Sequence, residues 1–457
     1  MSARLLFGSP AENILDLALS SGAQAAEAFF QQGVELRARA FEGALAELTS
    51  AQARGAGLRT FGGGRMGFAS TSDLGEESLR RLVKMALEVQ AHTDPDAFAG
   101  LPDATIETNG APAPGDLGDG RIDWRAGTRE RSRLALELDA RATSCRPAVR
   151  RTAGAVYSDE RVHTELHSSR GVHAAFEATV AYAFVEAVAE RGDEVQSGFG
   201  FTFARSPDGL DVGGCALEAA AGAESMLGAR TVRSGAYPVV FENRAWAALL
   251  GSMTAAITAQ GGEGVSALAR RIGEPVAAPG VSLVDDPCLP QGLASRPWDD
   301  EGVPSGRTAV IERGVLRSLL HNSETARRAG LARSTSNASR ESYRSAPEVG
   351  ATNLVFRAGE GSLEELLNRM GDGLLVTELS GLHTVDGISG DFSLGVSGFK
   401  VRRGRRGRPV RQTAIAGNVF TLLAEIEGIA GDLRFLYDAC FIGAPSILVR
   451  SLAVSSD

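Results

Sequence analysis

The chain has 457 residues, 43% of them hydrophobic, a mean hydropathy of -0.05 and a formal net charge of -9. This length predicts more than one domain, and the negative charge does not favour nucleic acid as a partner. No run of about 18 apolar residues occurs and the N-terminus lacks a long apolar core, so we expect a cytoplasmic protein without membrane contact. The four cysteines are far apart and form no CxxC pair, which argues against a disulfide framework or a cysteine-type zinc site.

An N-terminal α/β domain is predicted over 1–115. We expect helices over 10–21 and 74–91, and strands over 25–31, 34–41, 55–61 and 66–70. The triplet Gly62-Gly63-Gly64 joins the last two strands. No Lys-Ser/Thr follows at P-loop spacing, so we interpret it as a hairpin turn. The segment 93–122, rich in Pro, Gly, Asp and Ala, is expected to be a connector.

A strand-rich middle segment is predicted over 116–230. Helices are expected over 124–144 and 211–227, and strands over 151–158, 162–168, 172–188 and 194–205. His163 and His167 flank Glu165 at a spacing of four residues, which on a helix would suggest a metal pair. On a strand, positions four residues apart are about 13 Å apart, so we do not interpret them as metal ligands.

A larger mixed-sheet C-terminal domain is predicted over 231–457. The strand 237–241 leads into a helix that begins at Asn243 and buries Trp246, Leu249 and Leu250 at helical spacing. The later run Asp299-Asp300-Glu301 suits either a cation site or a turn, because adjacent side chains on an extended chain point apart. Asn418 is expected to cap a last helix.

The segment Ser380–Lys400, SGLHTVDGISGDFSLGVSGFK, is a glycine-rich loop between two predicted strands. It contains His383, Asp386 and Asp391, the only constellation in the chain that suggests acid–base chemistry, and no GxSxG motif accompanies it. The alternative is that these side chains only satisfy backbone groups of the loop. Beyond it, the arginine-rich turn Arg402–Arg411 is either a solvated hairpin tip or a site for an acidic or phosphate-bearing partner.

Long motifs resemble the TldD/PmbA family: GLHTVDGISGDFSLGVSGF followed by TAIAGN, DDPCLPQGLASRPWDDEGVPSGRT, and the earlier GRMGFASTSDL. The resemblance covers nearly the whole chain in order. It implies an α+β fold with three segments, a cytoplasmic location and dimers. TldD-like members of the family carry HExxxH on the helix after the first C-terminal strand, with a later cysteine as a zinc ligand. Two imidazoles and a thiolate hold zinc there, while the glutamate activates water.

This chain has LLGSMTAA on that helix, so Gly251, Ser252 and Ala256 replace the zinc motif, within about one residue. Cys440 lies nearer the Gly443-Ala444-Pro445 turn than the ligand cysteine of the family, and we do not assign it as a ligand. The sequence therefore resembles the TldE (PmbA) branch. The resemblance implies that this chain binds no cofactor and that its partner binds the zinc.

Two functions follow from the resemblance. In the first, the chain is the metal-free partner of a TldD-like HExxxH subunit, in a complex that cleaves unfolded peptides during leader removal or small-protein turnover. In the second, the chain is a homodimeric binding or regulatory protein of the gyrase-modulator type. No catalytic residue is assigned in the first case, and His383, Asp386 and Asp391 are the candidates if the chain is catalytic.

Overall fold

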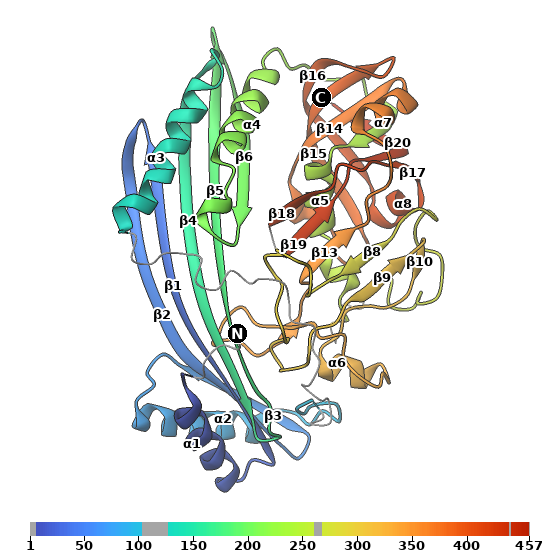
Figure 1. Ribbon diagram of the computed structural model, residues 1–457. Helices are drawn as coiled ribbons and strands as arrows, with labels where there is room; N and C mark the ends of the chain where they lie inside the picture. Colours follow the sequence, from blue (N-terminus) through green and yellow to red (C-terminus); the bar gives the residue numbers. More distant parts are fainter. Residues whose placement is uncertain (1–5, 103–126, 260–266, 438–439, 457) are drawn as a thin grey trace.

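The computed structural model describes residues 6–102, 127–259, 267–437 and 440–456. Its strands and helices form an α+β fold with a long N-terminal sheet beside a C-terminal domain (Figure 1). The expected α+β class is therefore confirmed. The expected boundary at 115/116 lies outside the described residues. Among the described residues, no helix combines the length and apolar character needed to cross a membrane.

The first two predicted segments share one antiparallel sheet, in the order β3-β2-β1-β4-β5-β6. Its strands are β1 (Ala25–Phe41), β2 (Ala44–Gly62), β3 (Arg65–Thr71), β4 (Val149–Ser168), β5 (His173–Arg191) and β6 (Glu194–Ala204). One face carries α1 (Gly8–Ser20) and α2 (Glu76–His92) at one end, and α3 (Thr128–Ser144) and α4 (Val212–Ser225) at the other (Figure 1). The opposite face is turned toward the C-terminal domain.

The expected strand pairs 25–31/34–41 and 151–158/162–168 were wrong, because each pair is one continuous strand. Gly33 sits at the predicted break in β1, yet it pairs with Ala53 of β2 and with Val162 of β4. Because β1 pairs with a neighbour on both sides, it stays extended through a glycine that, in the sequence alone, indicates the end of a strand.

α4 lies unusually close to β6. A Cβ on Gly198 would lie 2.2 Å from the Ala223 nitrogen, and one on Gly200 would lie 2.0 Å from the Cys215 carbonyl oxygen. Only glycine permits this approach. The intervening β6 side chains therefore face the other way, toward the C-terminal domain.

The C-terminal domain contains two further six-stranded sheets, ordered β16-β15-β14-β7-β20-β17 and β10-β9-β8-β13-β19-β18. The first comprises β7 (Gly235–Phe241), β14 (Gly373–Ser380), β15 (Asp391–Arg402), β16 (Arg405–Asn418), β17 (Ile426–Ile429) and β20 (Ile447–Ser455). The second comprises β8 (Leu283–Asp285), β9 (Thr308–Glu312), β10 (Val315–Leu316), β13 (Asn353–Phe356), β18 (Arg434–Tyr437) and β19 (Phe441–Ala444).

Short helices complete this domain: α5 (Asn243–Gly251), α6 (Ser323–Arg328), α7 (Leu363–Met370) and α8 (Val419–Ala424). As expected, Asn418 caps α8, since its side chain accepts hydrogen bonds from the Phe420 and Thr421 N–H groups.

Candidate functional site

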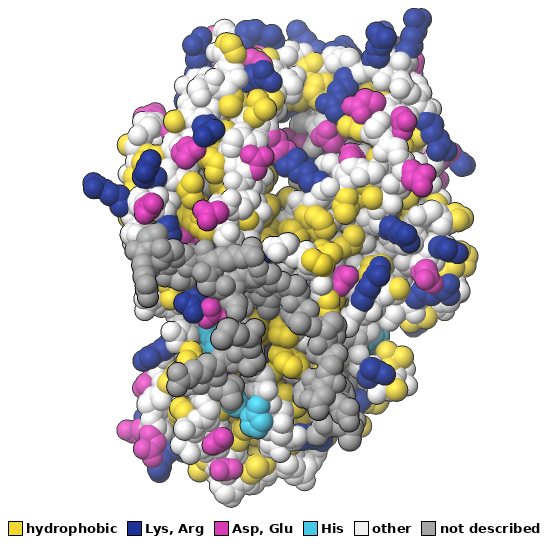
Figure 2. Space-filling view, in the orientation of Figure 1, with side chains coloured by type: hydrophobic (Ala, Val, Ile, Leu, Met, Phe, Trp, Pro, Cys, Tyr) yellow, Lys and Arg dark blue, Asp and Glu magenta, His cyan; other side chains and the backbone are white. Residues whose placement is uncertain are grey.

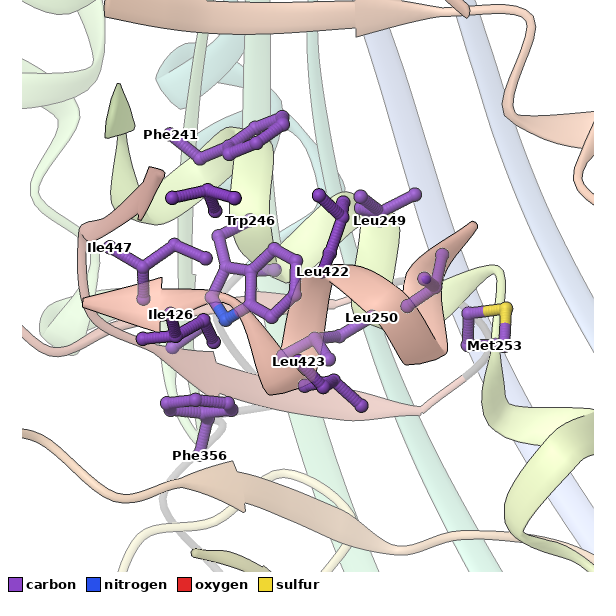
Figure 3. Close-up of a cluster of buried hydrophobic side chains, with 14 of the residues drawn as sticks. Phe241, Trp246, Leu249, Leu250, Met253, Phe356, Leu422, Leu423, Ile426 and Ile447 are labelled. Carbon is purple, nitrogen blue, oxygen red and sulfur yellow. The ribbon is translucent and has the colours of Figure 1, made fainter. Parts of the chain in front are cut away.

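The helix α5 is anchored in the core of the C-terminal domain, between its two sheets. Trp246 is fully buried, with its ring 6.0 Å from that of Phe241 and 5.8 Å from that of Phe356 (Figure 3). Leu249 is also fully buried. The spacing of these apolar residues predicted the packing, but the helix ends at Gly251 and a 3-10 turn follows over Thr254–Ile257.

The end of α5 and the 3-10 turn after it hold the three positions that the family resemblance aligns with the zinc motif. Gly251 is buried, and Ala256 is 1% exposed. The Ser252 hydroxyl donates to the Leu249 carbonyl at 2.7 Å. None of these three side chains supplies an imidazole, a thiolate or a carboxylate. Among the described residues, no group of three or more His, Cys, Asp or Glu side chains is placed to hold a metal ion.

The loop between β14 and β15 brings the acidic candidates together but leaves the histidine apart. Asp386 accepts hydrogen bonds from the Ile388 and Ser389 N–H groups, which lower the pKa of its carboxyl. Asp391 accepts from the Asn418 amide at 2.8 Å. His383 is exposed, and within the described residues no hydrogen bond joins it to either aspartate. Both carboxylates thus organise the loop itself.

This loop lies next to the turn that follows α5. A Cβ on Gly387 would lie 3.3 Å from the Ala255 Cβ. The segments singled out by the sequence therefore meet in space. The side chains at their meeting point are mostly small or turned to backbone groups, so they do not form a catalytic constellation.

A groove lies instead between the N-terminal sheet and the C-terminal domain. Its sheet wall is a row of half-buried aromatic rings from β5 and β6. The Phe184 ring is 4.9 Å from that of Phe201, and Phe201 is 6.3 Å from Phe203. The row continues to Tyr437 on β18, whose ring is 6.1 Å from Phe203. Two cavities of about 930 Å³ and 770 Å³ form this groove, and they share a wall at Phe199, Glu378 and Leu379.

Charged side chains of both signs border the same groove. Figure 2 shows the surface hollowed between the two halves of the molecule, where hydrophobic, basic and acidic side chains meet. Arg244 at the start of α5 donates to the Phe199 carbonyl at 3.1 Å and lies over the Phe201 ring. Burial raises the pKa of Glu378; the charges of Arg244 and Arg411 oppose this rise, and the charge of Glu186 adds to it. Within the described residues, neither Glu186 nor Glu378 forms a salt bridge.

A third cavity of about 660 Å³ borders the other side of β6 and is lined by α4 and β18. Glu218 on α4 accepts two hydrogen bonds of 2.6 Å from Arg434 and one of 2.7 Å from Arg244. Burial alone would raise the pKa of Glu218, but these arginines lower it. The ion cluster thus ties α4 to the first turn of α5 and to β18.

The histidines that we did not interpret as metal ligands lie on β4, as expected for a strand. Glu165, which lies between them in the sequence, contacts both histidines: its carboxylate lies 2.8 Å from His163 Nε2 and 3.1 Å from His167 Nε2. The same carboxylate accepts from the backbone N–H groups of Leu6 and Phe7. This cluster holds the start of the described chain against the sheet.

Sequence reasoning missed the groove. The available signal was the run Ser197–Phe203, SGFGFTF, in which alternating Gly and Phe already imply one face against a backbone and one aromatic face. The opposite wall comes from residues 377–379 and 436–437, and no local pattern in the sequence links these to β6.

Comparisons with known proteins agree with this architecture. Residues 26–89, 122–227 and 234–456 match the family models for domain 1, the central domain and the C-terminal domain of the PmbA/TldA metallopeptidases. The Haemophilus influenzae protein named "Metalloprotease PmbA homolog" is 28% identical over 453 residues, covering 97% of this chain and 94% of the relative. "Metalloprotease PmbA" of Escherichia coli O157:H7 is 28% identical over 389 residues, or 83% and 81%.

Solved structures show the same fold. A putative modulator of a DNA gyrase from Thermotoga maritima has a TM-score of 0.86 and 28% identity, over 98% of this chain and 100% of that one. TldE from Thermococcus kodakarensis has a TM-score of 0.88 at 21% identity, over 98% and 100%. With all three domain models matched in order along the chain, this protein belongs to the PmbA/TldA metallopeptidase family.

Proposed function

We propose that this chain is the metal-free, TldE-like partner subunit of a zinc metallopeptidase that cleaves unfolded peptides. Its partner is a TldD-like subunit carrying HExxxH, and the two form a dimer in the cytoplasm. The zinc and the catalytic glutamate come from the partner. This chain supplies one wall of the peptide chamber, in leader-peptide removal or in the turnover of small proteins.

One observation carries the proposal: a helix follows the first C-terminal strand, but the positions that the family resemblance aligns with the zinc motif hold Gly251, Ser252 and Ala256. Moreover, none of the six histidines in the sequence is followed by glutamate, so HExxxH does not occur in this chain. The buried Trp246 anchors this helix in the core. A packed helix without ligand side chains suits a subunit that completes a chamber rather than one that activates water.

The groove supports a role in handling peptides. Aromatic rings of β5 and β6 line its sheet wall, and charged side chains of both signs border it. An extended peptide presents alternating side chains and free amide groups, both of which such a site can recognise.

The experiment is co-purification of the chain with a TldD-like protein from the same cell, followed by a cleavage assay on an unfolded peptide. We expect a two-chain complex that cleaves, with zinc bound in the partner. If the chain forms no complex and the TldD-like protein cleaves fully without it, the proposal is wrong.

The alternative, a homodimeric regulatory protein of the gyrase-modulator type, draws on the basic hairpin that joins β15 and β16. Arg402, Arg403 and Arg405 at its tip are exposed. Others are engaged: Arg406 pairs with Glu242 at 3.3 Å, while Arg408 donates to the Thr231 carbonyl. A homodimer that binds an acidic partner and shows no affinity for a TldD-like subunit would favour this alternative.

A further inference from the structure

A small polar cavity of about 280 Å³ lies at the end of the N-terminal sheet that carries α1 and α2 (Figure 1). Its walls come from the turn between β2 and β3, the turn between β4 and β5, and residues within 19–25 and 99–101. In the described part of the chain, this cavity shares no lining residue with either cavity of the groove. It is therefore a separate site.

The glycine triplet of the sequence forms one wall of this cavity. The triplet is a hairpin turn, as predicted: Gly62 pairs with Arg65, and Gly63 and Gly64 have φ values of +60° and +71°, which favour glycine. Gly62 and Gly64 line the cavity together with Arg65. The turn is thus no P-loop, yet it places an arginine beside a stretch of backbone that carries no side chains.

The charged residues that line the cavity, within the described residues, are Arg65 and Arg170, and no Asp or Glu is among them. Arg65 Nη1 donates to the Thr93 carbonyl at 2.5 Å. Arg170 Nη1 donates to the carbonyls of Leu101 and Pro102, each at 3.0 Å. These bonds orient both guanidinium groups. Arg65 Nε and Nη2 make no hydrogen bond within the described residues, so these donors remain for a ligand.

Two neutral side chains add hydrogen-bond donors to the same cavity. Ser169 Oγ accepts from the Ala26 N–H at 2.9 Å, which leaves the hydroxyl hydrogen to donate. Gln24 Oε1 accepts from the Gly63 N–H at 3.2 Å, which leaves the two hydrogens of its amide nitrogen. A cavity lined by cations and donors suits an anion.

We propose that this cavity binds a phosphate group, either as the free ion or at the end of a larger phosphomonoester. Pockets for drug-sized ligands measure roughly 300–1,000 Å³, so a cavity of about 280 Å³ suits a smaller group. A guanidinium binds two oxygens of an anion at once. A carboxylate has only one such pair of oxygens, whereas a phosphate offers more, so arginines on two walls can bind it together. The site does not depend on the proposed function.

The test is isothermal titration calorimetry of inorganic phosphate into the full chain, with the ionic strength held constant by sodium chloride. We expect saturable binding of one phosphate per chain and competition by sulfate, a tetrahedral anion of similar charge. Acetate should bind about tenfold more weakly or less, because one carboxylate cannot engage both arginines. Absence of saturable phosphate binding, or acetate binding as tight as that of phosphate, would overturn the proposal.

Variants locate the site on the protein. Arg65→Gln keeps a donor but removes the charge, and it is expected to weaken phosphate binding about tenfold or more. Ala99→Leu fills the cavity and leaves both arginines in place, so a similar loss is expected. The matched control is Arg80→Gln, an exposed position on α2 outside the cavity, where binding should change by about twofold or less. Unchanged binding in both Arg65→Gln and Ala99→Leu would contradict the assigned site.

Melting temperatures without phosphate show whether the variants fold. If Arg65→Gln unfolds because its bond to the Thr93 carbonyl is lost, Ala99→Leu decides, since it keeps that bond. Methyl phosphate, in which one oxygen is esterified, separates the two sources of the group. Binding within about threefold of inorganic phosphate assigns the site to the end of a larger molecule, and loss of binding assigns it to the free ion; both results uphold a phosphate site. The chain is measured alone and without a cleavage assay, so the result is independent of the proposed peptidase role.

Discussion

Arg59 holds Glu27 through two hydrogen bonds, of 2.9 Å from Nε and 2.7 Å from Nη2, in a fully buried pair between β2 and β1. The same guanidinium reaches Glu301 of the C-terminal domain at 3.1 Å. Arg340 donates to Glu27 Oε1, the oxygen that also accepts from Arg59 Nε, and lies over the Phe29 ring. The three consecutive acids Asp299-Asp300-Glu301 thus belong to an interdomain ion network and to turns. Within a turn, Asp299 accepts hydrogen bonds from the Glu301 and Val303 N–H groups.

Removing one member of this network should destabilise the protein strongly. Arg59→Ala leaves the buried Glu301 without its cation and Glu27 with Arg340 alone, so we expect a loss of about 3–5 kcal/mol in the free energy of unfolding. The matched control is Arg80→Ala on α2, whose pair with Glu76 is exposed and should change stability by about 0.5 kcal/mol or less. Urea denaturation measures both variants. Similar small losses in the two would show that the network does not hold the domains together.

The Glu165 cluster predicts a loss of stability in acid. Burial alone would raise the pKa of Glu165, but hydrogen bonds from His163, His167 and two backbone N–H groups lower it from 4.5 to about 2. Because the folded-state pKa lies below the ordinary value, the carboxylate stabilises the fold above about pH 4.5, and this contribution disappears as the pH falls toward 2.

Unfolding free energies of wild type and Glu165→Gln should therefore differ most near pH 7 and converge as the pH falls below about 4. The difference at neutral pH is expected to be at most about 3 kcal/mol. A difference that stays constant from pH 7 to pH 3 would contradict this account of the cluster.

The loop between β14 and β15 should depend on its glycine more than on its histidine. Gly390 has φ +81°, and a Cβ there would lie 2.8 Å from the Phe420 ring. Gly390→Val should therefore impair folding or assembly. His383 is exposed, so His383→Gln should support near-normal cleavage by the two-chain complex.

Dimer formation and cleavage rate would be compared for these two variants. A hundredfold slower cleavage by His383→Gln with assembly intact, equivalent to about 2.7 kcal/mol of transition-state stabilisation, would make the loop an active site.

The tip of the arginine-rich hairpin should be dispensable for folding. Arg403 and Arg405 are exposed, and the Arg406–Glu242 pair is a half-exposed one at 3.3 Å. Replacing all three arginines by Ser should leave the melting temperature nearly unchanged, since each surface change contributes within about 0.5 kcal/mol. A large drop would mean that the tip packs against the rest of the molecule. Loss of salt-dependent binding to an acidic partner in this variant would support the alternative function.

The purified chain alone is expected to contain no stoichiometric zinc. By the family resemblance, Gly251, Ser252 and Ala256 stand where the zinc motif would be, and none of the three offers an imidazole, thiolate or carboxylate to the ion. Elemental analysis after metal-free purification measures this. About one tightly held zinc per chain would contradict the assignment and direct attention to the histidines of β4.

Local patterns predicted much of the secondary structure. The buried face of α5, the cap by Asn418 and the strand character of His163 and His167 all follow from short-range periodicity and side-chain chemistry. The continuity of β1 through Gly33 does not, because pairing with two neighbours decides it. Asp73 and Glu76 have the spacing of a capping box in the sequence, yet Asp73 accepts hydrogen bonds from the Gly75 N–H and the Ser78 hydroxyl instead.

The groove and the ion network could not be predicted from the sequence for the same reason. Nothing in the sequence distinguishes Glu27, Arg59 and Arg340 from charged residues exposed to solvent. They are buried only because the two domains contact each other there. Similarly, Phe201 and Glu378 line one cavity although they are 177 positions apart in the sequence. Tertiary contact of this range leaves no trace in local periodicity.

The central claim is that this chain completes a peptidase without supplying its metal. The most direct measurement is the cleavage rate of an unfolded peptide by a TldD-like HExxxH subunit as this chain is added. The account predicts little cleavage by either chain alone and a rate that rises to a plateau at equal amounts of the two. Full cleavage by this chain alone, or no change in rate on its addition, would contradict it.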